Sequence, residues 1–420
     1  MTSMASTCNS SLRIGLLSYR SNPHCGGQGV YIKSLSRALS DLGHKIDVLS
    51  GPPYPILDAD INLVKLPSLD LYNANDLFRI PKTVELMNTI NMIEWLGIST
   101  MGFSEPLTFG MRAYQYLKNK FHQYDIIHDN QSLSYGLWAI KKKIPTIATI
   151  HHPITVDLDI AVKSEPVLWK KLKHLRWYSF LSMQKKVTRT LPHIITVSRC
   201  AQNDISSKFR IPKNRFTVIS NGINTNLFYP IPEIKREKNR IIVTNSADTP
   251  LKGLDYLLQS VADVSKKINI RLVVVGTPKK NGRILRLIKK LGIAPFVRFT
   301  GRISDEEFVR QYAKATVAVI PSVYEGFGLP AGEAMACGVP LISTTGGALP
   351  EVVGDAGILV PPADSGALTE AITRVLTNPD LAEKLSAAGY QRVQNHLTWQ
   401  AAAEKTVNVY RRAINDYRKI

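Results

Sequence analysis

Two glutamates eight positions apart, Glu325 and Glu333, are the side chains of this sequence whose spacing most clearly suits a binding site. Residues 316–321 before them predict a buried strand that ends at a proline. A Gly/Pro turn at 326–330 follows, and residues 333–337 predict a small-residue helix ended by a glycine. Such a loop lies at the carboxyl end of a parallel strand, where open α/β sheets bind ligands.

Carboxylates in this position accept hydrogen bonds from hydroxyls, and amides at a helix start hold phosphate. The stretch therefore suits a ligand that carries both groups, such as a sugar nucleotide. The alternative is that Glu333 is only a charge favoured by the helix dipole and Glu325 only a solvated loop residue.

A second polar position follows the expected strand at 145–150, which runs directly into His151 and His152. A histidine at the carboxyl end of a parallel strand can donate a hydrogen bond to a substrate or accept a proton. The alternative is a strand-end histidine bonded to the backbone.

A glycine-rich loop at 22–29 connects a strand at 12–18 with a helix at 30–42, and a strand at 45–49 comes next. This βαβ order predicts a parallel sheet with right-handed crossovers. The loop is not a dinucleotide fingerprint. It either lets a ligand approach the backbone or is only a tight turn.

At 420 residues the chain predicts two or three domains, and its apolar fraction of 44% is that of a globular protein. No apolar run reaches the length of a membrane span, and the N-terminus does not have the pattern of a signal peptide. Four scattered cysteines without a metal-ligand spacing indicate reduced thiols in a cytoplasmic protein. Two Asp-x-Asp triplets, at 58–60 and 157–159, are interpreted as chance spacings, so no metal site is expected.

The strand and helix pattern restarts after a charged, proline-bearing stretch at 230–239, which predicts an interdomain linker. Two doubly wound halves would then face a cleft that holds the ligand. The expected domains are 1–230, 231–398, and a last helix at 399–420 that packs back toward the first domain. The remaining expected strands are 62–66, 124–128, 193–198, 216–219, 240–244, 271–275, 297–300, 317–320 and 340–343.

Between these patterned parts, residues 84–96 predict an apolar helix and residues 97–109 predict a loop. That loop either shapes an acceptor site or is ordinary packing.

The formal net charge is +20, and residues 160–190 concentrate it on a segment with interleaved aromatic side chains. A basic helix of this kind can lie on an anionic membrane surface or bind nucleic acid, or it can be a solvated face over a normal core. Since no nucleic-acid motif is present, the functional expectation is peripheral attachment to the inner face of a membrane and no nucleic-acid partner.

The stretch from Glu325 to Pro340 resembles the donor-site motif of the family-4 retaining glycosyltransferases, which have the GT-B fold of two Rossmann-like domains. The similarity covers nearly the whole chain. Further matching segments are 218–224, 252–255, 275–276, 300–301 and 351–353.

The resemblance implies a metal-independent, retaining, hexosyltransferase-type enzyme that needs no cofactor. Its donor would be a UDP-, GDP- or ADP-sugar, and its acceptor a lipid, a glycan or a small molecule. Carried over by position, Glu325 would bind hydroxyls of the donor sugar, Glu333 the ribose, and Lys252 the diphosphate. His151 would bind the transferred sugar. The backbone of the donor loop and of the first glycine loop would approach the donor, at Gly27, Gly326, Phe327, Gly328 and Leu329.

The sequence departs from the family pattern at the diphosphate, because residues 244–253 contain no arginine before Lys252. Ser246 or Arg302 are the expected substitutes. Asn224 also stands where the family commonly has an aspartate.

Two other classes of function stay open on the residues alone. One is a sugar-nucleotide epimerase of the same fold, which would bind the same donor but need its own acid/base pair. The other is a basic membrane-surface or nucleic-acid binder without catalysis.

Overall fold

The computed structural model describes residues 11–22, 27–71, 73, 76, 79–151, 154–155, 158–159, 162, 165–244 and 250–419. The chain divides into two compact units. The first contains residues 1–197, 202–219 and 402–420, and the second contains 198–201 and 220–401. The division therefore falls at 219/220 and 401/402, and the stretch 230–239, expected as the linker, belongs to the second unit and has no helix or strand.

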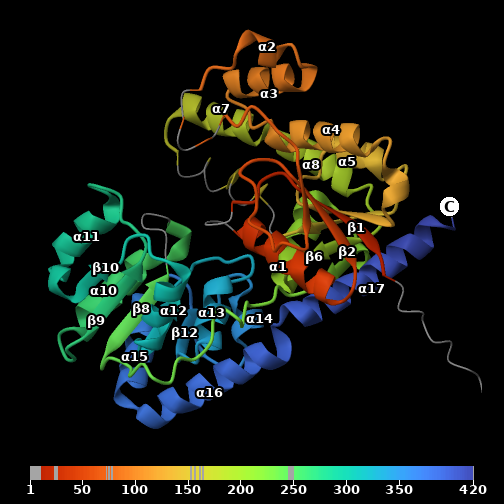
Figure 1. Cartoon of the computed structure of the whole chain (residues 1–420). Coiled ribbons are helices and arrows are strands. Elements are labelled where there is room, and N and C mark those ends of the chain that lie inside the picture. The colour runs from red at the N-terminus through yellow and green to blue at the C-terminus, as the bar shows by residue number, and fades with distance from the viewer. Residues whose placement is uncertain are drawn as a thin grey trace, which may run out of the picture. The chain divides into compact units, whose positions relative to one another are not determined.

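Within the described part of the first unit, one parallel sheet has the strand order β3-β2-β1-β4-β5-β6-β7 (Figure 1). Its strands are short apolar runs, and most are buried on both faces, as expected for a parallel sheet covered by helices. They are β1 (Arg13–Ser18), β2 (Lys45–Ser50), β3 (Asn62–Lys65), β4 (Ile126–Asn130), β5 (Thr146–Ile150), β6 (Ile194–Thr196) and β7 (Phe216–Val218).

The helices of this unit alternate with the strands, which is the doubly wound pattern. They are α1 (Gly27–Asp41), α2 (Thr83–Leu86), α3 (Thr89–Ser99), α4 (Glu105–Leu117), α5 (Tyr135–Ile140), α7 (Leu168–Trp177), α8 (Leu181–Thr188), most of α9 (Arg199–Phe209) and most of α17 (Trp399–Tyr417). Residues 402–417 of α17 belong to the first unit, although α17 follows the whole second unit in the chain.

The described residues of the second unit form a second parallel sheet, with the order β10-β9-β8-β11-β12-β13. Its strands are β8 (Arg240–Thr244), β9 (Arg271–Val275), β10 (Val297–Phe299), β11 (Val317–Ile320), β12 (Leu341–Thr344) and β13 (Ile358–Val360). Its helices are α10 (Leu254–Val264), α11 (Arg283–Leu291), α12 (Asp305–Ala313), α13 (Leu329–Ala336), α14 (Leu349–Val353), α15 (Ser365–Thr377) and α16 (Pro379–His396).

Alternation along the strands divides the second sheet into two faces. Ile241, Leu272 and Val274 enter one buried core together with apolar side chains of α10, α11 and α15. Two parallel Rossmann-like sheets covered by helices confirm the expected α/β class. The strand predictions agree with the structure to within one or two residues, apart from β13, which was not expected.

The prediction for residues 84–109 is wrong in detail. Asn88 ends the first helical stretch, because its side chain caps α3 by accepting from the amides of Ile90 and Asn91. The expected loop is mostly helix, with α3 reaching Ser99 and α4 beginning at Glu105. The glycine loop expected at 22–29 is also shorter, since α1 begins at Gly27.

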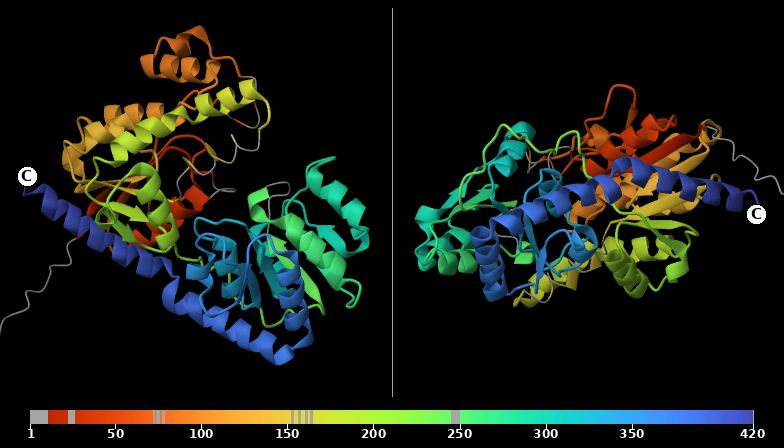
Figure 2. Two further views of the ribbon diagram at one scale, coloured as in Figure 1. Left: turned by 180° about the vertical axis from the view of Figure 1, so that it is seen from behind. Right: turned by 90° about the horizontal axis from the view of Figure 1, so that it is seen from below.

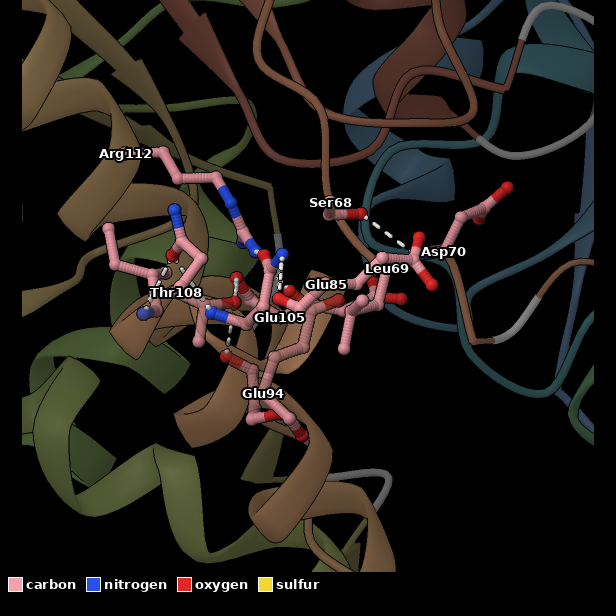
Figure 3. A network of polar contacts seen from close by, with 12 residues as sticks. Ser68, Leu69, Asp70, Glu85, Glu94, Glu105, Thr108 and Arg112 are labelled. Carbon is pink, nitrogen blue, oxygen red and sulfur yellow. Dashed lines mark hydrogen bonds and ion pairs between the residues drawn. The ribbon is translucent and has the colours of Figure 1, made fainter. Parts of the chain in front are cut away.

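A buried polar network joins α3 to α4 (Figure 3). The Glu94 carboxylate is 1% exposed and accepts a 2.5 Å hydrogen bond from Nη2 of Arg112, which also donates to Asn91 Oδ1 at 2.7 Å. Burial raises the pKa of Glu94 and raises that of nearby Glu105 to about 7. This segment is therefore held by charge pairing in a dry environment, where an unpaired carboxylate is costly.

We expect Arg112→Ala to lower the free energy of unfolding by about 3–5 kcal/mol, because it leaves Glu94 buried without its counter-charge. Arg37→Ala is the control, since its ion pairs with Asp41, Asp58 and Asp60 all join exposed side chains. The control should cost at most about 0.5 kcal/mol. Urea unfolding followed by circular dichroism measures both, and equal shifts would contradict the assignment.

Candidate active site

An ion pair between Lys252 and Glu325 forms the centre of the candidate site in the second unit. Lys252 Nζ lies 2.6 Å from Glu325 Oε1, and Ser322 Oγ donates to the same oxygen at 2.9 Å. Lys252 follows β8 and Glu325 follows β11, and these strands are neighbours in the sheet. Parallel pairing therefore brings two residues 73 positions apart to the same edge.

Both side chains keep part of their surface open, with 32% of Lys252 and 11% of Glu325 exposed. The lysine offers a positive charge where water is partly excluded. The carboxylate has hydrogen-bond capacity beyond its two partners. The pair can thus bind an anion and a hydroxyl side by side.

The loop after Glu325 is held in a tight backbone conformation. Gly328 has φ +102°, and a Cβ there would lie 2.7 Å from Leu349 Cδ2. Gly347 packs so closely that its Cβ would lie 2.2 Å from the carbonyl oxygen of Glu325. Ala348 N–H donates to that oxygen at 2.8 Å. The glycines therefore allow contacts that fix the position of the Glu325 backbone.

Helix α13 begins at Leu329, directly after this loop. Pro330 lies in its first turn and has no N–H, and Ala331 N–H donates to Gly328 O. Among the described residues, no acceptor receives the N–H of Gly328 or Leu329. These two amides mark a helix N-terminus suited to an anion.

Glu333 lies in the second turn of α13 and is half-buried. Burial raises its pKa to about 7, and the negative charge of Asp305 adds to the shift. The same group contributes to the raised pKa of the Cys337 thiol, after the effect of burial. Near neutral pH this carboxyl group is close to its titration point.

His151 lies at the carboxyl end of β5 in the first unit, as expected. Its Nε2 is 2.7 Å from Asn130 Oδ1, and its backbone N–H donates to Gln131 Oε1 at 2.8 Å. An amide oxygen only accepts, and Asn130 Nδ2 donates to Ser18 Oγ, so Nε2 of His151 carries the proton. The ring also packs edge-on against Tyr31, with centroids 4.6 Å apart.

A buried hydrogen-bond chain lies beneath this histidine. His128 bonds Tyr410 Oη and Thr149 Oγ1, each at 2.7 Å, and Thr149 Oγ1 is 2.9 Å from Tyr31 Oη. Burial lowers the pKa of His128 to about 3, so this ring is neutral. The chain connects the last helix, α17, with the strands that carry His151 and Asn130.

The other predicted site residues make none of the contacts described above. Arg302 is exposed after β10, which lies two strands from β8 in the sheet. Phe327 is 7% exposed and packs in the core, so only its backbone can face a ligand. Gly27 begins α1, and a Cβ there would meet nothing within 4 Å. Ser246 and His152 lie outside the described residues.

Four residues in this geometry were not expected from the sequence: Ser322, Asn130, Gln131 and Tyr31. Asn130 carried a usable signal, because a polar residue ends the strand next to the one that ends at His151. The described residues contain no group of three or more His, Cys, Asp or Glu able to hold a metal ion. No helix in the described part of the chain is long and apolar enough to cross a membrane.

Two family models match the chain in succession. The model described as glycosyltransferase family 4 matches residues 25–227, and the one described as glycosyl transferases group 1 matches residues 229–392. The chain is also 45% identical over 408 residues to "MMP alpha-(1->4)-mannosyltransferase" of Mycolicibacterium hassiacum, covering 96% of this chain and 98% of that protein.

The chain belongs to the family-4, group 1 glycosyltransferases.

Solved structures agree on the GT-B fold of this glycosyltransferase. Sucrose-phosphate synthase of Thermosynechococcus elongatus superposes with a TM-score of 0.72 at 25% identity, covering 96% of this chain and 100% of that one. Anabaena HepE, solved in complex with UDP-glucose, gives 0.66 at 16% identity and covers 97% of this chain and all of its own.

We expect the stability of the wild type to fall relative to Glu333→Gln as the pH rises. A folded-state pKa of about 7, above the ordinary value of 4.5 for a glutamate, favours the protonated form in the fold. This contribution is complete below pH 4.5 and is lost as the pH passes 7, by an amount of the order of 3 kcal/mol.

The measurement is the difference in urea unfolding midpoint between the two proteins from pH 5 to pH 8. Taking the difference cancels other titrating groups, such as Glu105. A difference that does not change with pH would rule out the shifted pKa of Glu333.

Proposed function

We propose that this glycosyltransferase moves a mannosyl group from a nucleotide-activated donor to the 4-hydroxyl of a glycan acceptor, with retention and without a metal ion. The observation that carries the proposal is the Lys252–Glu325 pair beside the first amides of α13. The identity of the sugar and the linkage follow the name of the 45% identical relative.

Departure of the nucleoside diphosphate is the step that the second unit is suited to assist. Negative charge grows on the diphosphate as the glycosidic bond breaks. Lys252 supplies a fixed positive charge, and the N–H groups of Gly328 and Leu329 supply aligned dipoles. Lys252 therefore supplies the counter-charge that a metal ion supplies in other transferases, and Arg302 and Ser246 are candidates to replace the arginine absent before it.

The carboxylates hold the uncharged parts of the donor. Glu325 accepts from hydroxyls of the sugar, and ionised Glu333 accepts from the ribose. When the donor binds, Lys252 exchanges its salt bridge with Glu325 for one with the phosphate. The Glu325 carboxylate is then available to the hydroxyls of the sugar. For His151 we propose the role that the family resemblance implies, a hydrogen bond to the transferred sugar.

Retention follows if the acceptor hydroxyl attacks the face from which the diphosphate departs. The bond from the anomeric carbon to the phosphate oxygen breaks and the bond to the acceptor oxygen forms. The acceptor proton passes to the departing phosphate oxygen. An α-linked donor then gives an α-linked product, and the protein needs no nucleophile of its own.

The test is transfer to short α-(1→4)-linked mannosides with GDP-, UDP- and ADP-mannose and the corresponding glucose donors, with and without EDTA. We expect one mannose donor to be used, an α-linked product by NMR, and no effect of EDTA. A β-linked product would exclude retention. Epimerised donor formed without acceptor would favour the epimerase alternative.

We expect Lys252→Ala and Glu325→Gln each to lower kcat/KM by about 10²–10³, since each removes an interaction with the donor that strengthens in the transition state. Lys266→Ala is the matched control, because Lys266 is a 71% exposed lysine of the same unit that pairs with Asp263. It should retain full activity. Steady-state rates of nucleoside diphosphate release measure all three, and an active Lys252→Ala enzyme would refute the assigned role.

We further propose that α7 attaches the enzyme to an anionic membrane surface. Leu168, Trp169, Leu172 and Leu175 are between 49% and 73% exposed, at helical spacing along α7. Lys170, Lys171 and Lys173 lie between them. Arg176 Nη2 donates to Thr100 Oγ1 and Phe103 stacks on Trp177, so the end of α7 is anchored beside α3 (Figure 2).

We expect co-sedimentation with phosphatidylserine vesicles at low salt. Changing Lys170, Lys171 and Lys173 together to Glu should lower partitioning by at least about two orders of magnitude, because each lost lysine removes about 1 kcal/mol and the new carboxylates are repelled by the lipid. Lys289→Glu with Lys290→Glu, on α11 of the second unit, is the control. Absence of binding at low salt would remove the proposal, because screening is then weak.

A further inference from the structure

A polar pocket in the second unit is lined by neither Lys252 nor Glu325. Its volume is about 260 Å³. Its floor is the face of β8, β9 and β10 opposite the core with α10, α11 and α15, and residues of α12 line its wall. The charged and polar side chains that line it include Arg240, Arg271 and Arg298 from the strands and Glu307, Gln311 and Lys314 from α12 and its end.

Arg240 is the most buried of these cations, with 6% of its side chain exposed. Its Nη1 pairs with Glu237 at 2.6 Å, and its Nη2 donates to Gln311 Oε1. Its Nε–H is buried and has no partner. A buried guanidinium donor that lacks an acceptor is costly, so it indicates that an acceptor is missing from this pocket.

The charges of the pocket are unbalanced. Four cations face two carboxylates, Glu237 and Glu307. Glu237 is shared between Arg240 and Arg271, the latter at 3.4 Å. In the part of the chain that the structure describes, Arg298 and Lys314 have no ion-pair partner. The excess is two positive charges in one concave site.

We propose that this pocket binds the phosphate group of a small phosphorylated molecule, as a site separate from the donor site. A phosphate monoester carries a charge of about −1.5 to −2 at neutral pH, which matches the excess. Guanidinium groups suit its oxygens because they donate in a planar fork. The volume lies just below the usual range for small-molecule pockets, so it suits free phosphate or a sugar phosphate.

The electrostatics of Arg240 agree with this assignment. Burial lowers its pKa, and the charges of Arg271 and Arg298 lower it further, against the effect of Glu237. A bound anion would relieve both the burial and the repulsion. This inference does not depend on which sugar the enzyme transfers.

The experiment is equilibrium dialysis of the full chain with radiolabelled orthophosphate and with a hexose 6-phosphate, at fixed ionic strength and with saturating nucleoside diphosphate to occupy the donor site. We expect about one phosphate bound per chain. Arg298→Ala should weaken that binding at least tenfold, and its exposed position protects the fold. Lys290→Ala, an exposed cation on α11, should leave the binding unchanged. Lys252→Ala should also leave it unchanged, because the second site does not include that lysine.

Phosphate binding that nucleoside diphosphate abolishes would overturn the proposal, since the anion would then belong to the donor site. Equal binding by wild type and Arg298→Ala would overturn it as well. Binding of phosphatidic acid vesicles that Arg298→Ala abolishes, without binding of either soluble phosphate, would replace a small metabolite by a lipid headgroup.

Discussion

The ion pair between Lys252 and Glu325 is the constraint around which the second unit is arranged. Each group alone would lose hydration in this partly buried position, and pairing offsets that loss. Ser322 completes the pair by donating to the shared carboxylate oxygen. The contact is possible because β8 and β11 are neighbours in a parallel sheet. The loops that carry Lys252 and Glu325 therefore both begin at the carboxyl end of the sheet.

The close packing of the loop after Glu325 protects this geometry. Gly328 and Gly347 occupy positive φ values at places where a side chain would collide with Leu349 or with the Glu325 backbone. The start of α13, directly after this loop, is therefore held in a fixed position. Charge and dipole act together there, which a surface lysine on a mobile loop could not achieve.

The first unit uses neutral hydrogen bonding instead of charge. His128 is buried and uncharged, and it connects Tyr410 of α17 with Thr149 of β5. Asn130 then determines the tautomer of His151. Helix α17 thus supports the strand ends of the first unit. This contact explains why residues 402–420 belong to that unit although they follow the second unit in the chain.

Much of this architecture can be read from the order of residues alone, because buried parallel strands are short apolar runs and glycines mark their ends. The two sheets, Glu325, Glu333 and His151 were all placed in this way.

Local patterns misled where tertiary packing dominates. Gly97 does not mark a loop. It lies inside α3, and a glycine is needed there because a Cβ would lie 2.6 Å from Ser104 Cβ. Pro106 does not mark a loop either, because it lies in the first turn of α4. The residues that contact the site residues could not be predicted from sequence spacing either. Lys252 beside Glu325, Asn130 beside His151, and the three arginines of the polar pocket meet only when strands distant in sequence pair side by side.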